Sequence, residues 1–300
     1  MIRRFFLALF LFCFTLPLLA TEKLNIYSVN YPLHYFIQQI SGSLTKPVFS
    51  LPDTIDPAFW QPTISDVQAF QQADLILING AGYAKWIETV SLPRRKMINT
   101  SKSFKEDYIH EKKKATHNHG TDGDHSHSGI AFTTWLDMHL ANQQARAIKD
   151  ALVKKLPEYT QNLENNYTSL SKDLIELDNH WKKLFKRIQE QTVLASHPIY
   201  QYLARRYQLK IQSMQWEPNT YPDEQEWRAL ISYLNKHPIN FMLWEDEPLN
   251  KTKERLKQLG ITVVVFSQAA NKPEQINWLG VMKRNTKLLE QALNESGIVK

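Results

Sequence analysis

Cysteine is nearly absent from this chain of 300 residues, in which Cys13 is the only one. It lies within an apolar run, residues 5–20, that follows two arginines and ends at Ala20, just before a polar stretch. This layout is typical of a secretory signal peptide, and about sixteen apolar residues are few for a membrane span. A lipid-anchored cysteine would follow such a run, so we expect residues 1–20 to be cleaved near Ala20 and the protein to be exported free. An uncleaved N-terminal anchor is the alternative.

The rest of the chain lacks cysteine, a second long apolar run and a strong charge. Without disulfides, a large apolar core must hold an exported protein of about 280 residues together. The 36 basic residues, less the two arginines of the leader, leave 34 against 30 acidic residues, an excess of 4, and the signs alternate. Such a balance excludes a nucleic-acid-binding footprint, so we expect no nucleic-acid partner. No catalytic motif is present, neither a Ser/His/Asp or Cys/His arrangement nor His-Glu-x-x-His, and we expect no enzyme.

Short apolar strands alternate with amphipathic helices in the first and last thirds of the chain. In the first third, strands are predicted over residues 24–29, 48–51 and 75–78, with a helix capped by Ser65 and running to Ala73. In the last third, the pattern predicts strands over 192–195, 241–244 and 261–266 and helices over 200–207, 249–259 and 279–293. Strands that alternate with helices favour parallel sheets with right-handed crossovers.

A long helical region, residues 140–191, lies between these two parts. From Leu163 to Ile188 apolar residues recur every three or four positions, and the stretch contains no glycine. The spacing predicts one long helix from about Pro157 to Gln191. The predicted fold class is therefore α/β, with two lobes joined by one long rigid helix. The lobes are assigned to residues 21–139 and 192–300.

Several segments resemble the metal-binding proteins of zinc and manganese ABC importers, and the likeness covers nearly all of the exported chain. The segments are Asn30-Tyr31-Pro32-Leu33, Pro62 to Asp66 with Ala73 to Gly80, Trp135-Leu136-Asp137 with Asn142, and His197 with Tyr202 to Tyr207. The resemblance implies two Rossmann-like lobes, a rigid helical connection and a metal site in the cleft between the lobes. It also implies a periplasmic protein that hands its ion to a permease in the inner membrane.

The chain departs from the ligand set that the resemblance implies. The histidine of the family's first-lobe motif corresponds to Ala58, and a second, two residues before Trp135, corresponds to Thr133. The third is present as His197. The fourth ligand, an acid near the end of a late strand, falls in the neighbourhood of residues 266–268, which reads Phe-Ser-Gln. One imidazole alone does not hold zinc tightly, because the ion takes about four donors.

From about Lys102 to Gly129 the periodic pattern stops, and residues 110–128 form a His-rich loop. Four of the ten histidines fall within eleven residues, namely His117, His119, His125 and His127. Together with the intervening aspartates they offer imidazoles and carboxylates to a borderline metal. We expect a mobile loop that binds zinc with a dissociation constant of about a micromolar or weaker, because ordering it costs entropy. The alternative is a solvated loop without a role.

Residues at predicted strand ends are the candidates for a remodelled cleft site, since open α/β sheets bind ligands there. His197 follows one such strand, and Glu245 and Glu247 follow another. The alternative for the two glutamates is a solvated acidic turn. Asp53 and Asp56 follow the second predicted strand and are candidates to replace the missing first-lobe histidine.

Four tryptophans are expected near the cleft, Trp60, Trp135, Trp216 and Trp244. They could exclude water from a metal site, contact an organic ligand or, most simply, belong to the ordinary core between the lobes.

These features predict a monomeric, periplasmic solute-binding protein of a metal ABC import system. Zinc is the expected ion, ahead of manganese, and its proposed ligands are the four loop histidines, His197, Glu245 and Glu247. The alternative is a divergent relative with a degenerate cleft, which buffers metal or binds a non-metal ligand.

Overall fold

The computed structural model describes residues 23–110, 116–118, 124–126, 129–237 and 239–295. The predicted signal peptide lies outside these ranges. Within them, no helix has both the length and the apolar character that a bilayer crossing requires.

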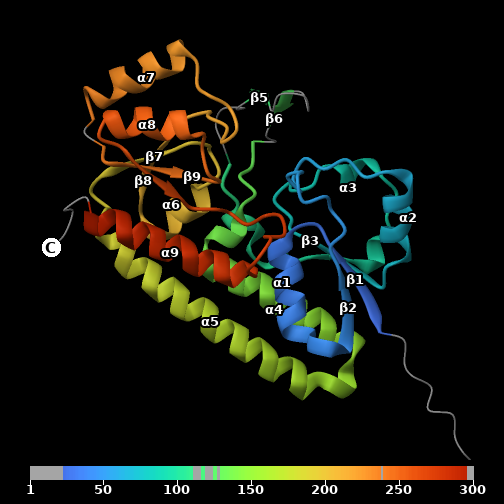
Figure 1. Cartoon of the computed structure of the whole chain (residues 1–300). Helices are drawn as coiled ribbons and strands as arrows, with labels where there is room; N and C mark the ends of the chain where they lie inside the picture. Colours follow the sequence, from blue (N-terminus) through green and yellow to red (C-terminus); the bar gives the residue numbers. More distant parts are fainter. Residues whose placement is uncertain (1–22, 111–115, 119–123, 127–128, 238, 296–300) are drawn as a thin grey trace, which may run out of the picture.

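Two parallel sheets, each of four strands, form the centres of two lobes (Figure 1). The first sheet has the order β2-β1-β3-β4, with β1 Leu24–Ser28, β2 Thr45–Val48, β3 Leu75–Ile78 and β4 Met97–Asn99. The second has the order β10-β9-β7-β8, with β7 Thr192–Ala195, β8 Lys210–Ser213, β9 Phe241–Trp244 and β10 Thr262–Val265. The predicted α/β fold class is confirmed. The strand predicted over residues 48–51 was wrong in position, and β8 was not predicted.

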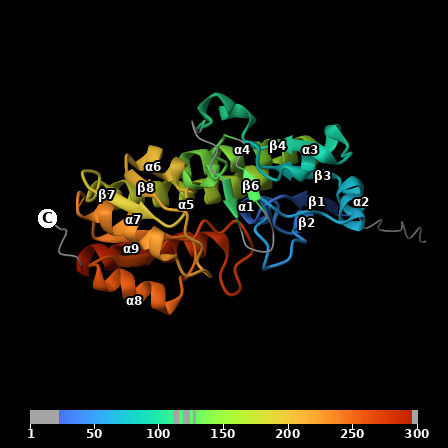
Figure 2. The same ribbon diagram turned by 90° about the horizontal axis from the view of Figure 1, so that it is seen from above.

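Helices cover both sheets (Figure 2). They are α1 Tyr31–Ser41, α2 Ile64–Gln72, α3 Trp86–Thr89, α4 Met138–Lys155, α5 Thr160–Lys186, α6 Gln201–Tyr207, α7 Glu224–Leu234, α8 Asn250–Gln258 and α9 Trp278–Glu295. Short 3-10 turns are η1 Gly42–Leu44, η2 Arg94–Lys96, η3 Lys102–Asp107, η5 Thr134–Leu136 and η6 Pro157–Tyr159. Thr63, and not Ser65 as predicted, caps α2, because Thr63 and Asp66 form a reciprocal capping box.

Helix α5, 27 residues long, joins the lobes (Figure 1). It packs against α1 and α4 on the first-lobe side and against α6 and α9 on the second-lobe side. Its Asp178 accepts two hydrogen bonds from Arg206 of α6, of 3.0 and 2.6 Å. Arg206 also lies 3.6 Å from Asp137, the N-cap of α4. One guanidinium therefore ties the second lobe to both helices of the linking region.

The stretch from Lys102 to Gly129 is more regular than predicted. Residues 102–107 form η3, which buries Phe104. His110 pairs with Ile130 in an isolated antiparallel bridge. Beyond it, β5 Thr116–Asn118 and β6 Asp124–Ser126 pair as a two-stranded antiparallel ribbon. The sequence pattern did not predict these elements, and the mobility of the His-rich loop stays a prediction.

Candidate metal centre

Three neighbouring strands of the second sheet end at one place and carry three candidate ligands. Strand β7 lies between β8 and β9, and all three run parallel. Beyond the strands, the Ser196 N–H donates to Leu243 O at 2.8 Å, and the Trp216 N–H donates to Ser196 O at 2.9 Å. These backbone bonds extend the pairing past the strand ends. As a result, His197, Glu217 and Glu245 reach the same edge of the sheet.

The side chains of these three residues converge, and we call them the cleft triad. One imidazole nitrogen and one oxygen from each carboxylate all lie within 4.8 Å of one another. His197 Nδ1 is 3.4 Å from Glu217 Oε1, and the two side chains are 4% and 21% exposed. An imidazole and two carboxylates at this spacing are a donor set for a divalent metal, and the two negative charges match its charge.

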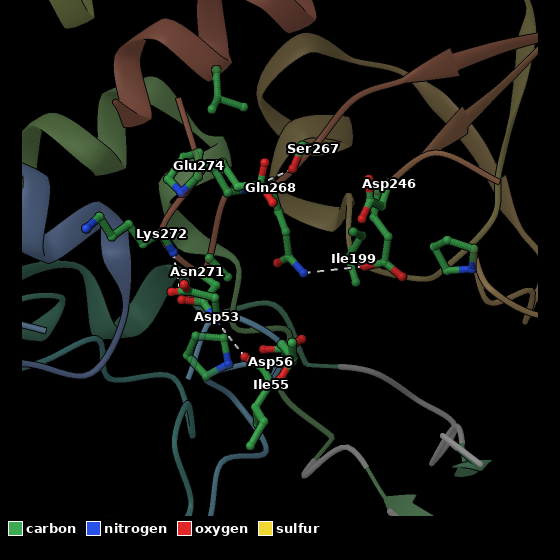
Figure 3. Close-up of a pocket in the computed structure, with 18 of the residues that line it drawn as sticks. Asp53, Ile55, Asp56, Ile199, Asp246, Ser267, Gln268, Asn271, Lys272 and Glu274 are labelled. Atoms are coloured by element: carbon green, nitrogen blue, oxygen red, sulfur yellow. Dashed lines mark hydrogen bonds between the residues drawn. The ribbon is translucent and has the colours of Figure 1, made fainter. Parts of the chain in front are cut away.

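Two further groups surround Glu245. Gln268 Nε2 donates to Glu245 Oε2 at 3.4 Å, the contact drawn as a dashed line from Gln268 in Figure 3. Tyr200 is buried, and this burial together with the negative charge of Glu245 raises the pKa of its phenol well above its ordinary value. The phenol therefore stays protonated and donates to Phe266 O at 2.8 Å.

The cleft triad opens into a cleft of about 900 Å³ between the lobes. Asp53 and Asp56 line its first-lobe wall, opposite the strand ends (Figure 3). Asp56 Oδ1 accepts the N–H of Ala58 at 2.8 Å, so part of this carboxylate stabilises its own loop. Both aspartates therefore face the cleft as predicted, but the group of converging donors found among the described residues does not include them.

Ala58 and Thr133, which stand where the family resemblance implied first-lobe histidines, are both buried in the core. Ala58 is 7% exposed and offers no donor side chain. Thr133 is buried, and its hydroxyl donates to Ile199 O of the second lobe at 2.6 Å. Thr133 thus joins the two lobes directly.

Two groups of predicted residues lie elsewhere. Glu247 forms an ion pair with Lys253 and is not among the residues that line the cleft. The four tryptophans are core rather than cleft wall. Trp60 packs edge-on against Trp86, Trp135 is fully buried, and Trp216 and Trp244 belong to a cluster with Trp227.

The histidines of the His-rich loop are placed only in part. His117 of β5 and His125 of β6 are direct partners across the antiparallel ribbon. His119 and His127 lie outside the described residues. The backbone therefore puts two of the four predicted ligands opposite each other.

Glu217 is the member of the cleft triad that sequence reasoning missed. It follows β8, whose residues are alternately exposed and half-buried and lack the apolar run of a central strand. The feature that could have revealed it is its position: Glu217 stands a few residues after the end of a strand, as His197 and Glu245 do, although that strand is a weak edge strand.

Comparison with known proteins agrees with the motif resemblance. The profile of the family described as "Zinc-uptake complex component A periplasmic" matches residues 26–292. The high-affinity zinc uptake system protein ZnuA of Bacillus subtilis is 25% identical over 283 residues, which cover 91% of this chain and 88% of that protein. The zinc-binding lipoprotein AdcA of Streptococcus pneumoniae is 23% identical over 301 residues. The chain spans 60% of the length of that relative.

Solved structures show the same fold. The metal-dependent lipoprotein YcdH of Bacillus subtilis superposes with a TM-score of 0.77 at 20% identity, covering 90% of this chain and 98% of that one. The Zn(II)-bound ZnuA-like domain of Streptococcus pneumoniae AdcA gives 0.76 at 20% identity, covering 90% and 99%. Proteins of the matched family bind solutes and are not enzymes, which confirms the expectation that this chain is not an enzyme.

Proposed function

Because the chain belongs to the family of periplasmic zinc-uptake components, we propose that it binds zinc in its cleft and delivers the ion to an ABC permease. The observation that carries this proposal is the cleft triad. Its three donors come from three adjacent parallel strands, and their ligand atoms lie within 4.8 Å of one another. Two carboxylates this close to each other repel unless a cation lies between them. Their convergence beside a buried imidazole therefore favours a metal site over a degenerate, metal-free cleft.

The proposed site differs from the one that the family resemblance implied. Ala58 and Thr133 supply no nitrogen from the first lobe, and Glu217 and Glu245 provide oxygen instead. The metal is therefore held mainly by the second lobe. Zinc accepts such a mixture of imidazole and carboxylate ligands, although an oxygen-rich set discriminates less strongly against manganese than an all-histidine set.

The His-rich loop is proposed as a second, weaker zinc site. Opposed His117 and His125 are the backbone feature that supports it. A hairpin of two short strands is marginally stable by itself, so binding there includes the cost of ordering the ribbon. We expect this site to exchange zinc readily and the cleft to hold it longer.

The test separates the two sites by mutation within the full exported chain. In a loop-alanine variant, His117, His119, His125 and His127 are all replaced by alanine. Zinc is titrated into the wild-type chain and this variant by calorimetry, in competition with a chelator. We expect the loop-alanine variant to keep one tight site, and His197→Ala in that background to abolish it. Glu274→Gln, which alters another cleft-lining glutamate, is the matched control and should leave the affinity unchanged.

Two outcomes would refute parts of the proposal. If the loop-alanine variant binds no zinc near neutral pH, the cleft is not a metal site and a non-metal ligand becomes the better hypothesis. The second outcome concerns delivery to a permease and is measured in cells of the source organism that lack the native protein. If the loop-alanine variant binds zinc, but these cells take up zinc equally well when they carry the wild-type protein or His197→Ala, the proposed delivery is wrong.

A further inference from the structure

A loop of the first lobe that contains no helix or strand forms part of the cleft wall. It comprises residues 49–63, between the ends of β2 and the start of α2. Residues 53–57 of this loop all line the cleft, and residues 52–55 are exposed. Leu51 and Ala58, on either side, are buried. Loops of this length without secondary structure are uncommon in compact proteins and are often lids of functional sites. We call residues 52–56 the lid turn.

A side chain of the second lobe reaches across the cleft to the lid turn. Asn271 Nδ2 donates to the carbonyls of Pro52 and Ile55, both at 2.8 Å, and Figure 3 shows Asn271 beside this turn. The bond within the turn, from the Ile55 N–H to the Pro52 carbonyl, is longer at 3.3 Å. An amide nitrogen carries two N–H donors and serves both carbonyls at once, which a hydroxyl or a carboxylate cannot do. The contact therefore depends on the carboxamide of Asn271.

Asn271 is fixed in position on the second-lobe side. Its Oδ1 accepts the N–H of Lys272 at 2.7 Å, so both ends of the carboxamide are bonded. The carbonyl of the preceding Ala270 accepts the N–H of Tyr31 at 2.8 Å. Ala269 has a φ of +50°, a left-handed conformation that L residues adopt only where their surroundings hold it. The exposed lid turn, rather than Asn271, is therefore the part of this contact that can move.

We propose that Asn271 is a latch that holds the lid turn across the cleft, and that metal enters and leaves the cleft when this latch opens. This inference rests on the proposed function. Hydrogen bonds at an accessible rim contribute little net free energy, because water competes for the same groups. The latch therefore opens as a local event, without unfolding of the lobe. Because the carboxamide is bonded to backbone groups at both ends, it stabilises the closed cleft with or without metal. Its loss should speed metal entry and exit alike.

The first experiment measures zinc exchange by stopped flow in the loop-alanine variant, with a fluorescent zinc indicator as competitor. Asn271→Ala removes both donors of the latch. We expect the association and dissociation rate constants to rise together by about fivefold or more, the factor that two modest hydrogen bonds give. The dissociation constant, which is their ratio, should not change. Gln275→Ala, at an exposed glutamine of the same cleft, is the control and should exchange zinc like the parent.

The second experiment follows the latch without metal. Cys13 lies in the predicted leader, so an introduced thiol is the only one in the exported chain. Ala58→Cys places a thiol at the buried end of the lid turn. In excess chelator, a thiol reagent should label it about fivefold faster or more when Asn271→Ala is also present. Ala151→Cys in α4 is the control, since Ala151 is 9% exposed and Ala58 7%, and its labelling rate should not depend on Asn271.

The outcomes distinguish the latch from other roles of Asn271, with circular dichroism as the check on folding. Unchanged zinc exchange in Asn271→Ala would overturn the inference. If only dissociation accelerates and the affinity falls by the same factor, Asn271 stabilises the metal-bound state and the latch is wrong. Faster labelling at Ala151→Cys as well would mean that Asn271 stabilises the whole fold, which also refutes it.

Failure of the proposed function would give a different result. If the parent binds no zinc, the cleft is not a metal site, and the labelling of Ala58→Cys still tests the latch. Faster labelling with Asn271→Ala would then support a latch over a cleft for another ligand, and an unchanged rate would overturn it.

Discussion

Replacing Glu217 by glutamine should stabilise the metal-free protein while weakening metal binding. The carboxylates of Glu217 and Glu245 approach within 4.8 Å. At that separation Coulomb's law gives a repulsion of about 1 kcal/mol with the dielectric constant of water and about 3.5 kcal/mol with an effective value of 20. Glu217 is 21% exposed, so the lower half of this range applies, and the contact with His197 offsets part of it. We expect Glu217→Gln to raise the free energy of unfolding by about 1 to 2 kcal/mol in excess chelator.

The sign should reverse when zinc is added. Losing one anionic donor weakens binding, and each tenfold loss of affinity removes about 1.4 kcal/mol of zinc-induced stabilisation at a fixed zinc concentration. The assay is urea unfolding of the wild type, Glu217→Gln and the control Glu274→Gln, each with chelator and with saturating zinc, in the loop-alanine background. If Glu217→Gln destabilises the protein with chelator and leaves the zinc-induced gain intact, Glu217 has a structural role and the metal site is wrongly assigned.

Three further predictions concern buried polar contacts of the fold. Thr133→Val removes the hydrogen bond to the Ile199 carbonyl and should lower the free energy of unfolding in urea by about 1 to 3 kcal/mol, because a buried carbonyl loses its donor. The zinc affinity of the cleft should not change. A large change in that affinity would make Thr133 part of the site. Burial, helped by a nearby lysine, lowers the pKa of His34 from 6.5 to about 4. The folded state therefore keeps this imidazole neutral, and its contribution of about 3 kcal/mol is present above pH 6.5 and lost as pH falls towards 4. His34→Gln should make unfolding less sensitive to acid between pH 7.5 and 5, whereas the exposed His139→Gln should not. Asp178→Asn weakens the pair with Arg206 and should cost about 1.5 to 3 kcal/mol in thermal or urea unfolding at neutral pH; equal stability would mean that the pair contributes no net energy.

The pH dependence of the Asp178 pair follows from its surroundings. Burial alone would raise the pKa of this carboxyl, but hydrogen bonds from Arg206 and Lys182 hold it below its ordinary value. The folded state thus favours the charged form. The stabilisation is present above the ordinary carboxyl pKa and is lost as pH falls through the lowered value.

Much of the fold was predictable because its signals are local. The buried strands β3, β7 and β9 are short apolar runs, and the stripe of α5 repeats every three or four residues, so each is visible within a short window of sequence. Strand β8 is an edge strand with the sequence Lys-Ile-Gln-Ser, half of it exposed, and its pairing with β7 decides its structure more than its composition does. The helix cap at Thr63 was misplaced by two residues for a similar reason, since Thr63 and Ser65 are both good caps and the reciprocal bond with Asp66 selects one.

For the candidate site, too, local sequence features were predictable and contacts between distant segments were not. The sequence by itself determined the two-lobe α/β architecture and the family, and it marked His197 and Glu245 as candidate ligands, because strand ends and motifs are local features. Only the tertiary structure decided that Glu217 joins them, that Glu247 turns to Lys253, and that Gln268 donates to Glu245. His197, Glu217 and Glu245 are 20 and 28 residues apart along the chain. They meet because β8, β7 and β9 pair side by side in parallel, and the order of strands in a sheet depends on packing between distant segments rather than on any local pattern.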